Sequence, residues 1–406
     1  MKILLAHNFY GSSAPSGENT VFLAERDLLQ NQKHQVIEYT RHSDEIRNRE
    51  PIGTIQGALS TPWNPFSRQK IRQLLINEQP DVMHVHNTFP LLSPAIFHAS
   101  IDLRTATVLT LHNYRIFCAA GIPTRNNVPC IDCLDQQCTL PALKYGCYRN
   151  SKLATLPMAI MIELHRQIKT WHRDVDAFIA LTEFQRNKLA DAGLPLDRMH
   201  TKPHFYPDPP ESLPWQEREP KVVFIGRLGP EKGLHVLIEA WNAWGDTAPP
   251  LELIGDGPER PKLKESVNQH RLRNKIHFSG QLPFPTVQEK LARARLLVLP
   301  TLCFEGFPMA IREAFALGVP VAASRLGSLP FLVEDGKNGV LFTPGDSADL
   351  YKKIKRLWDN SEKLEEMGRR ARVEFEEKYT EQVNYDLLMD IYRTAIEVRR
   401  RRNKFI

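Results

Sequence analysis

The chain has 406 residues, with 53 basic and 47 acidic side chains and a formal net charge of +6. This length is about twice that of one ordinary domain, so two domains are expected. The small excess of positive charge gives no reason to expect a nucleic-acid partner. No run of about 18 apolar residues predicts a membrane span, and His7 ends the first apolar run before it reaches the length of an export signal. We therefore expect a cytoplasmic protein.

Five short apolar runs in the first half of the chain alternate with helical or loop-rich segments. This alternation is typical of a doubly wound parallel α/β sheet. A loop that ends in Ser16-Gly17 follows the first run and precedes a helix over about residues 18–30. The expected strands are residues 2–6, 36–39, 82–85, 107–111 and 177–181.

Histidines lie in or directly after two of these strands. His112 follows the strand 107–111, at a carboxyl end where ligands collect in such sheets. An isolated histidine is more often a structural hydrogen-bonding residue than a catalyst. His84 and His86 alternate at strand spacing and could be mistaken for metal ligands. We expect one of them to be buried and the other to face a cleft.

Five of the six cysteines lie between Cys118 and Cys147, in an insertion over about residues 114–150. Cys130 and Cys133 have the spacing of half a zinc site, and Cys118 with Cys147 or Cys138 would complete four thiolates. A structural zinc is therefore one hypothesis. The alternative is a set of free thiols in a loop.

A glycine turn in the second half of the chain carries two cations. Residues 221–225 form an apolar strand that Gly226 ends, and helical spacing runs over 231–241. Arg227 and Lys232 therefore lie between a strand and a helix, where phosphate meets helix N–H groups. Each cation would contribute roughly 1.5–3 kcal/mol to the binding free energy of an anionic ligand. Solvated surface charges in an ordinary turn are the alternative.

A later turn carries two carboxylates. After the apolar strand 296–300, Glu305 precedes Gly306-Phe307-Pro308, and Glu313 lies in the helix that follows. Pro308 suits the first helical position, where backbone N–H groups are free for phosphate. One carboxylate is placed to meet a sugar and the other to reach farther along a ligand. An acidic first turn with no ligand is the alternative.

These residues resemble the retaining glycosyltransferases of family 4. The resemblance is carried by Gly226-Arg227-Leu228 with Glu231-Lys232-Gly233, by Glu305-Gly306-Phe307-Pro308 with Glu313-Ala314, and by Gly318-Val319-Pro320-Val321. It extends over nearly the whole chain and implies the GT-B architecture, with two Rossmann-like domains facing across a cleft. The family usually has a double glycine where this chain has Gly327-Ser328.

The resemblance also implies roles for the site residues. Arg227 and Lys232 would bind the donor diphosphate, Glu305 the transferred sugar and Glu313 the nucleotide ribose. His112 would lie beside the donor sugar as a catalytic residue. Backbone groups near the donor phosphate would come from Ser16 and Gly17, which replace the usual paired glycines, and from Gly226, Gly306, Phe307 and Pro308.

The expected domain organisation follows the family. Residues 1–205 would form an acceptor-binding domain, 218–380 a nucleotide-sugar-binding domain, and 381–406 a helix that returns towards the first domain, with a proline-rich linker near 203–220. The donor would be a nucleoside diphosphate sugar. The acceptor would be a glycan or a polyprenyl-linked glycan, in the assembly of a surface or exported polysaccharide.

The implied reaction retains the anomeric configuration and needs no metal, because Arg227 and Lys232 supply the positive charge. Cations over 399–404 and in the mixed segment 152–173 would permit peripheral contact with an anionic membrane on its inner face. Solvated helix ends are the alternative. An epimerase of the same architecture and a non-catalytic nucleotide-sugar-binding protein also remain open.

Overall fold

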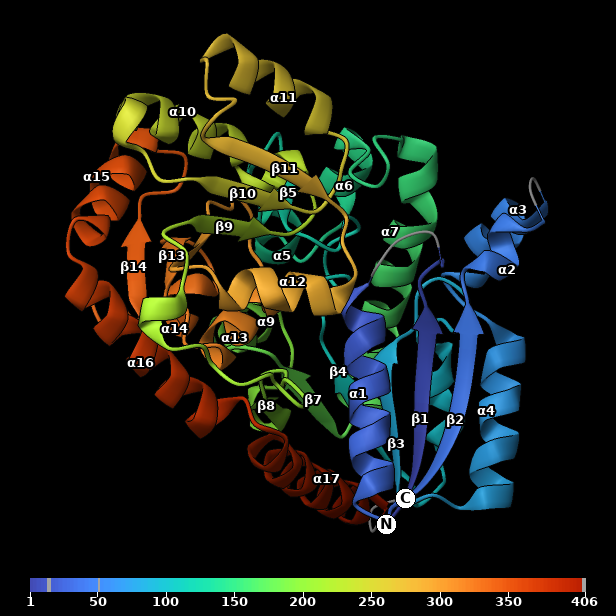
Figure 1. The fold of residues 1–406 in the computed structure, drawn as a ribbon. Helices are drawn as coiled ribbons and strands as arrows, with labels where there is room; N and C mark the ends of the chain where they lie inside the picture. The colour runs from blue at the N-terminus through green and yellow to red at the C-terminus, as the bar shows by residue number, and fades with distance from the viewer. Residues whose placement is uncertain (13–15, 50–51, 404–406) are drawn as a thin grey trace. The chain divides into compact units, whose positions relative to one another are not determined.

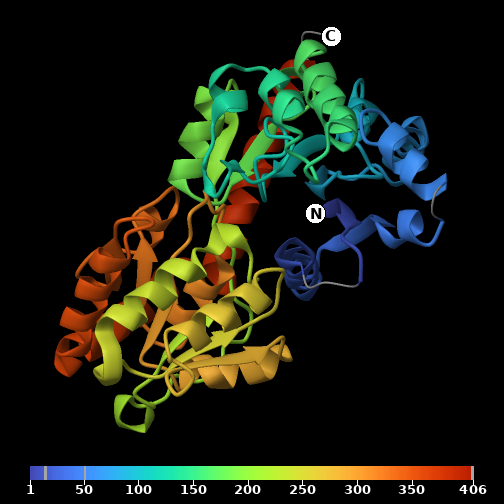
Figure 2. The ribbon, with the colours of Figure 1, turned by 90° about the horizontal axis from the view of Figure 1, so that it is seen from above.

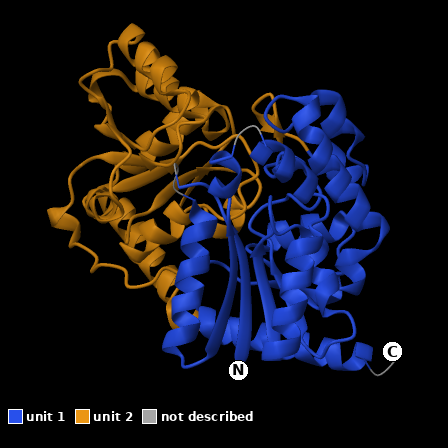
Figure 3. Cartoon of the chain, turned by 90° about the vertical axis from the view of Figure 1, so that its right-hand side faces the viewer, with its two compact units in different colours: residues 1–123, 131–204, 384–406 blue, residues 124–130, 205–383 orange. Residues whose placement is uncertain are grey.

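The computed structural model describes residues 1–12, 16–49 and 52–403. The chain divides into two compact units, coloured separately in Figure 3. The first unit contains residues 1–123, 131–204 and 384–406, and the second contains 124–130 and 205–383. No helix within the described ranges is both long and apolar enough to cross a bilayer.

The first unit is built on a six-stranded parallel sheet in the order β2-β1-β3-β4-β7-β8 (Figure 1). Every residue of β3, β4 and β7 is buried, which explains why these strands appear in the sequence as continuous apolar runs. The predicted parallel sheet is confirmed. Its strands are β1 (Lys2–Phe9), β2 (Gln35–His42), β3 (Val82–Asn87), β4 (Ala106–Thr110), β7 (Ala177–Ala180) and β8 (Met199–Thr201).

The helices of this unit connect and cover the strands. Ser16 caps the first helix with its side-chain oxygen, and Asn64 caps α4 in the same way. The helices are α1 (Gly17–Asn31), α2 (Asp44–Arg47), α3 (Ile52–Ser60), α4 (Pro65–Glu78), η1 (Pro94–Ser100), α5 (Asp132–Asp135), α6 (Leu140–Tyr145), α7 (Lys152–Gln167), α8 (Thr170–Arg173), α9 (Glu183–Asp191) and η2 (Leu196–Arg198). A short hairpin of β5 (Thr124–Arg125) and β6 (Val128–Pro129) belongs to the second unit.

The second unit has its own six-stranded parallel sheet in the order β11-β10-β9-β12-β13-β14. This is the strand order of a Rossmann fold. Successive strands are added on one side of β9 as far as β11, and from β12 onward they are added on its other side. The strands are β9 (Val222–Ile225), β10 (Leu251–Ile254), β11 (Ile276–Gly280), β12 (Leu296–Leu299), β13 (Val321–Ser324) and β14 (Gly339–Phe342).

Helices lie on both faces of the second sheet. In Figure 1, α10 and α11 lie above it and α12 and α13 below it, as right-handed crossovers require when the strand order reverses. The helices are η3 (Trp215–Glu217), η4 (Pro230–Lys232), α10 (Leu234–Trp244), η5 (Gly245–Thr247), α11 (Arg260–Gln269), α12 (Phe284–Ala292), α13 (Met309–Ala316), α14 (Leu329–Leu332), α15 (Ser347–Trp358) and α16 (Ser361–Lys378).

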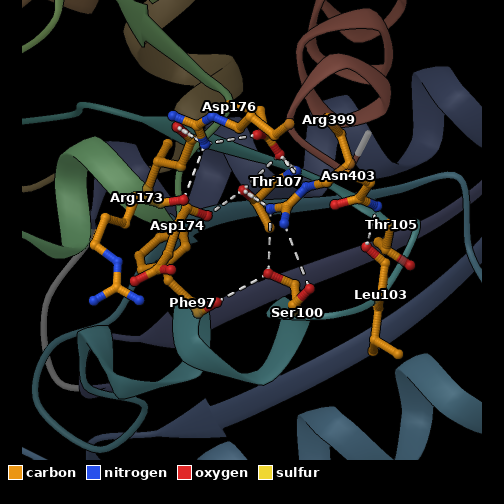
Figure 4. Close-up of polar contacts among 12 residues, drawn as sticks. Phe97, Ser100, Leu103, Thr105, Thr107, Arg173, Asp174, Asp176, Arg399 and Asn403 are labelled. Atoms are coloured by element: carbon orange, nitrogen blue, oxygen red, sulfur yellow. Dashed lines mark hydrogen bonds and ion pairs between the residues drawn. The ribbon is translucent and has the colours of Figure 1, made fainter. Parts of the chain in front are cut away.

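The last helix, α17 (Glu381–Asn403), belongs to the first unit from Asn384 onward and is drawn in red in Figures 1 and 2. Its apolar face packs into the core of that unit through residues such as Leu388 and Tyr392. Its end is held by the buried carboxylate of Asp176, as Figure 4 shows for Arg399. Arg399 Nε donates to Asp176 Oδ2 at 2.8 Å, and Arg402 Nη1 donates to Asp176 Oδ1 at 3.0 Å.

This arrangement changes the interpretation of the basic chain end. Arg399 and Arg402 are engaged inside the first unit, so these two cations are not available to a lipid surface. Their side chains neutralise a carboxylate that has no exposed surface.

We expect Arg399→Ala to lower the free energy of unfolding by about 3 kcal/mol. The buried carboxylate of Asp176 would then keep only Arg402 as a neutralising cation. Urea denaturation measures this change. The matched control is Arg401→Ala, since Arg401 is 78% exposed and reaches only Glu397 at 3.7 Å. Equal stability of the two variants would show that the Asp176 cluster does not anchor α17.

Candidate functional site

Two loops of the second unit meet where its strand order reverses. β9 and β12 are hydrogen-bonded neighbours, with Val222 opposite Leu296 and Val223 opposite Leu297. One loop follows β9 and contains Arg227 and Lys232, and the other follows β12 and contains Glu305. Ligands of doubly wound sheets bind outside the carboxyl ends of the strands at such a reversal. The topology therefore brings the predicted cations and the first carboxylate to the expected ligand-binding position.

An ion pair joins these two loops. Lys232 Nζ donates to Glu305 Oε1 at 2.6 Å, and the Thr301 hydroxyl donates to the same oxygen at 3.0 Å. Burial by itself lowers the pKa of Lys232, but the charge and hydrogen bond of Glu305 outweigh burial and raise it. Lys232 is thus held as a cation, and its partner is the carboxylate that the sequence assigned to the sugar.

Arg227 is the more open of the two cations. Its side chain is 60% exposed, and its Nη2 donates to Glu231 Oε1 at 2.6 Å. The backbone carbonyl of Glu231 accepts a hydrogen bond from Leu302 N at 2.8 Å, and its oxygen also lies 3.2 Å from the hydroxyl oxygen of Thr301, whose single proton is shared between this carbonyl and Glu305. Glu231 therefore fixes Arg227 and also ties the β9 loop to the β12 loop.

Glycine is required where these loops approach other backbone. Gly233 has φ = 67°, and a Cβ built on it would lie 2.0 Å from the carbonyl oxygen of Pro300. A Cβ on Gly255 would lie 2.0 Å from the carbonyl oxygen of Gly226. The close approach of Gly233 to Pro300 is what places Lys232 within reach of Glu305.

The start of α13 follows the loop that contains Glu305 and belongs to the same candidate site in the second unit. Pro308 is the N-cap of α13 and not its first residue, which corrects the predicted position by one. Because proline has no side-chain acceptor, it does not cap the first turn. Phe307 is buried against Tyr379, and the Ser328 hydroxyl donates to the carbonyl oxygen of Glu305 at 2.7 Å, which fixes the loop that contains Gly306.

Glu313 is buried inside α13. Burial raises its pKa, and the neighbouring Arg312 opposes that shift only in part. Arg312 is buried as well, and its guanidinium lies over the ring of Tyr206 with its centre 5.6 Å from the ring centroid. The assignment of Glu313 to a ribose stays a prediction.

In the first unit, Ser16 and Gly17 lie at the amino end of α1, directly after residues 13–15, which are outside the described ranges. The Ser16 side chain accepts a hydrogen bond from Asn19 N at 3.4 Å, so it serves as a helix cap. The next residue, Glu18, accepts a hydrogen bond from Asn113 Nδ2 at 2.7 Å, and burial raises its pKa.

His112 is the outermost member of a chain of hydrogen-bonded side chains. Its Nε2 lies 3.1 Å from His86 Nδ1, and His86 Nε2 lies 3.1 Å from Glu25 Oε1. Lys202 Nζ donates to the other oxygen of Glu25 at 2.9 Å, and His84 Nδ1 lies 3.0 Å from Glu25 Oε1. His84 and His86 are both buried, and one of them, His86, lines the same hollow as His112.

The charge on Glu25 determines the protonation along this chain. Burial by itself raises the pKa of Glu25, but Lys202 and the two histidines outweigh burial and hold it well below its usual value. The ionised Glu25 accepts the Nε2 proton of His86. With the His86 proton on Nε2, its Nδ1 is assigned as the acceptor of His112 Nε2–H, and the Nδ1 of His112 is then assigned a lone pair. Burial and the neighbouring histidines keep the pKa of His112 well below its usual value, so the ring is neutral.

The Nδ1 of His112 is buried and has no hydrogen-bond partner among the described residues. His112, Asn113 and Arg115 also line a hollow at the carboxyl ends of β3 and β4. An acceptor atom held without a partner beside a hollow suits a ligand hydroxyl. The structure thus places His112 at the end of a hydrogen-bonded network and beside a hollow, while a catalytic role stays a prediction.

The cysteines do not form the predicted zinc site. Cys130 falls in the segment 124–130, which belongs to the second unit. Cys118, Cys133 and Cys147 belong to the first unit, but within the described part of the chain no three of their sulfur atoms converge to 4.8 Å. Burial also raises the pKa of Cys118 to about 11, which disfavours the thiolate that zinc needs. The structure therefore does not support a structural zinc.

Three functional residues were missed by sequence reasoning, namely Glu25, Lys202 and Thr301. Glu25 and Lys202 join His86 in the network behind His112, and Thr301 helps Glu231 to tie the two loops of the second unit. Glu25 lies 61 residues from His86 in the chain, so no local motif signals their contact. A carboxylate on the apolar face of the helix after the first strand was the available signal.

Two family profiles match consecutive parts of the chain. The profile described as Glycosyltransferase Family 4 matches residues 15–207, and the profile described as Glycosyl transferases group 1 matches residues 207–374. The chain therefore belongs to the group 1, family 4 glycosyltransferases.

Individual relatives agree with this family. The chain is 26% identical over 236 residues to alpha-D-kanosaminyltransferase of Streptomyces kanamyceticus, which covers 54% of this chain and 61% of the relative. It is 28% identical over 206 residues to the putative colanic acid biosynthesis glycosyltransferase WcaL of Escherichia coli. This alignment covers 49% of each protein. The chain thus spans about half to three fifths of the length of these relatives.

A solved structure has the same fold. HepE of Anabaena, crystallised in complex with UDP, superimposes with a TM-score of 0.66 at 19% identity, covering 96% of this chain and 99% of HepE. Together with the two parallel sheets, this similarity confirms the GT-B fold class.

We expect Lys232→Met to weaken binding of a nucleoside diphosphate by about 10- to 100-fold, since it removes one charge-assisted contact worth roughly 1.5–3 kcal/mol. Glu305→Gln should not weaken that binding, because it frees Lys232 from its carboxylate partner. Isothermal titration calorimetry compares the variants, with Lys290→Met as control, since Lys290 pairs with Glu252 elsewhere in the same unit. Equal affinities for Lys232→Met and the control would remove Lys232 from the anion site.

We expect the neutral ring of His112 to carry its proton on Nε2. Long-range ¹H–¹⁵N spectra of protein labelled at the histidine rings report this tautomer, and the spectrum of His112→Asn identifies the signal. In His86→Phe, which lacks the acceptor nitrogen, the preference for Nε2–H should be lost. A proton on Nδ1 in the unaltered protein would contradict the order of hydrogen bonds from Glu25 to His112.

Proposed function

We propose that this chain is a retaining glycosyltransferase that moves a sugar from a nucleoside diphosphate sugar to a hydroxyl of a glycan or lipid-linked acceptor. The observation that carries this assignment is the Lys232–Glu305 pair at the reversal of the second sheet, in a chain that belongs to a glycosyltransferase family. A cation and a carboxylate in contact match the two ends of the bond that must break, a diphosphate on one side and a sugar on the other.

The reaction makes negative charge on the departing diphosphate. Arg227 and Lys232 are preorganised to stabilise that charge as it develops, together with N–H groups near Gly226, Gly306, Phe307 and Pro308. Because these cations perform the task that a divalent ion performs elsewhere, we assign a metal-independent transfer. Retention follows if the acceptor attacks from the side of the leaving group, with the departing phosphate taking the acceptor proton.

The ion pair itself provides a step in donor binding. When the diphosphate arrives, Lys232 exchanges the Glu305 oxygen for a phosphate oxygen, and the released carboxylate accepts hydrogen bonds from sugar hydroxyls. Diphosphate and sugar are therefore recognised together, while Glu313 is assigned to the ribose. In the first unit, we assign His112 to the support of the reacting sugar and Ser16-Gly17 to the donor phosphate.

The biological setting is inferred from chemistry and from the relatives. WcaL is described as a putative enzyme of colanic acid biosynthesis, and HepE was crystallised with UDP. We infer a role in the assembly of a surface or exported polysaccharide, with a cytoplasmic enzyme in peripheral contact with the inner face of the membrane.

A thermal-shift screen over nucleoside diphosphate sugars identifies the donor, because a ligand that binds the native state raises the unfolding temperature. Product analysis by NMR with that donor should then show a glycoside of unchanged anomeric configuration, formed equally well in EDTA.

We expect Lys232→Ala and Glu305→Ala to lower turnover at least about 100-fold. An inverted product, turnover of the donor sugar to its epimer, or unimpaired variants would each contradict the assignment.

A further inference from the structure

Helix α3 presents its apolar residues to solvent and its glycines to the protein. Gly53 and Gly57 are buried, and a Cβ on Gly53 would lie 2.0 Å from the carbonyl oxygen of Ile46. Ile52, Ile55 and Leu59 recur at the spacing of one helical face and are 60–73% exposed. A surface helix of a soluble protein normally has the opposite arrangement.

The neighbouring helix α7 repeats this pattern. Leu153, Leu156 and Ile160 share one face and are 81%, 42% and 46% exposed. The opposite face of α7 is anchored in a core cluster through Met158 and Ile162. The exposed stripe is therefore held on a fixed helix.

The helices that carry these exposed residues are neighbours. Helix α7 contacts both α3 and α6, and α6 adds the exposed side chains of Leu140 and Tyr145. We call the outer faces of α3, α6 and α7 the apolar surface. The six most exposed large hydrophobic residues in the described part of the chain are on this surface or at the start of α4, which makes the concentration unusual for surface residues. They are Leu153, Phe66, Leu59, Ile52, Leu140 and Ile55.

The segments that carry the apolar surface have an excess of basic residues. Residues 136–162 contain three basic residues and no acidic residue, and residues 47–77 contain five basic residues and one acidic residue. The basic residues are Lys144, Arg149 and Lys152 in the first segment and Arg47, Arg49, Arg68, Lys70 and Arg72 in the second. Arg47 pairs with Asp44 and Arg72 with Asp102, whereas Arg49, Arg68 and Lys70 are exposed. Lys152 immediately precedes Leu153 and lies one turn before Leu156, so cation and apolar stripe share a helix face.

We propose that the apolar surface docks on an anionic lipid bilayer, with the aliphatic side chains of α3 and α7 entering the interface and the flanking cations meeting lipid phosphates. Amphipathic helices with basic margins bind in this way, buried about 5–10 Å at the headgroup boundary. Charge selects this occupant over a second copy of the chain, because two copies of this surface would bring cations of the same sign together.

This inference deepens the membrane contact in the proposed function and moves it to a defined surface. Arg399 and Arg402 at the chain end are engaged with Asp176, so these two cations do not provide the contact. The α3–α7 face supplies both components of interfacial binding, apolar area and positive charge. A lipid-linked acceptor would then be present at the surface on which the first unit rests.

Flotation of the full chain with vesicles of phosphatidylcholine and phosphatidylglycerol tests the surface. The unaltered protein should float with these vesicles and bind vesicles of phosphatidylcholine alone more weakly. A variant with Ile55→Gln, Leu59→Gln, Leu153→Gln and Leu156→Gln should lose at least about tenfold of its binding. The matched control is Leu196→Gln with Val373→Gln, since both residues are 50% exposed and lie outside the surface.

A second variant, Lys144→Gln with Lys152→Gln, should lose binding to the anionic vesicles only, and it leaves the apolar residues in place. Unchanged flotation of both variants would overturn the inference. A dimer in solution that dissociates on substitution of the four apolar residues would overturn it as well, because the surface would then pair two copies.

The affinity for a nucleoside diphosphate, measured on the same samples, should be equal in the unaltered protein and all variants. Absence of this binding from the unaltered protein would overturn the proposed function and not the lipid surface.

Discussion

The Lys232–Glu305 ion pair is the interaction on which the account of this protein depends. It exists because the second sheet reverses its strand order between β9 and β12, which brings two loops separated by about 70 residues into contact. Gly233 permits the backbone approach, and Glu231 and Thr301 hold the loops in register. The pair keeps Lys232 charged in the absence of ligand, so the positive charge for a diphosphate is present before the ligand arrives.

Much of the fold could be predicted from sequence, because the strands of a parallel sheet are buried on both faces and appear as apolar runs at regular intervals. The loops that carry Arg227, Lys232 and Glu305 could be placed for the same reason, since each follows such a strand. Their pairing could not be predicted, because contact across strands depends on strand order. The edge strand β8 was missed because Met199–Thr201 is short and only partly buried.

The errors have physical causes as well. Cysteine spacing predicted zinc, but spacing does not determine whether sulfur atoms converge, and within the described residues no three cysteine sulfur atoms do so. His84 and His86 are both buried along β3, because Glu25 of helix α1 contacts both rings and His112 lies against His86. The exposed face of α3 was hidden from sequence reasoning, since apolar spacing shows which residues share a face and not which face is buried.

The most direct measurement is a crystal structure of the protein with a bound nucleoside diphosphate. We expect phosphate oxygens in contact with Lys232 Nζ and Arg227, close to the amino end of α13, with Lys232 moved from Glu305 towards the phosphate. A diphosphate bound elsewhere in the second unit, with the Lys232–Glu305 pair unchanged, would contradict the central claim.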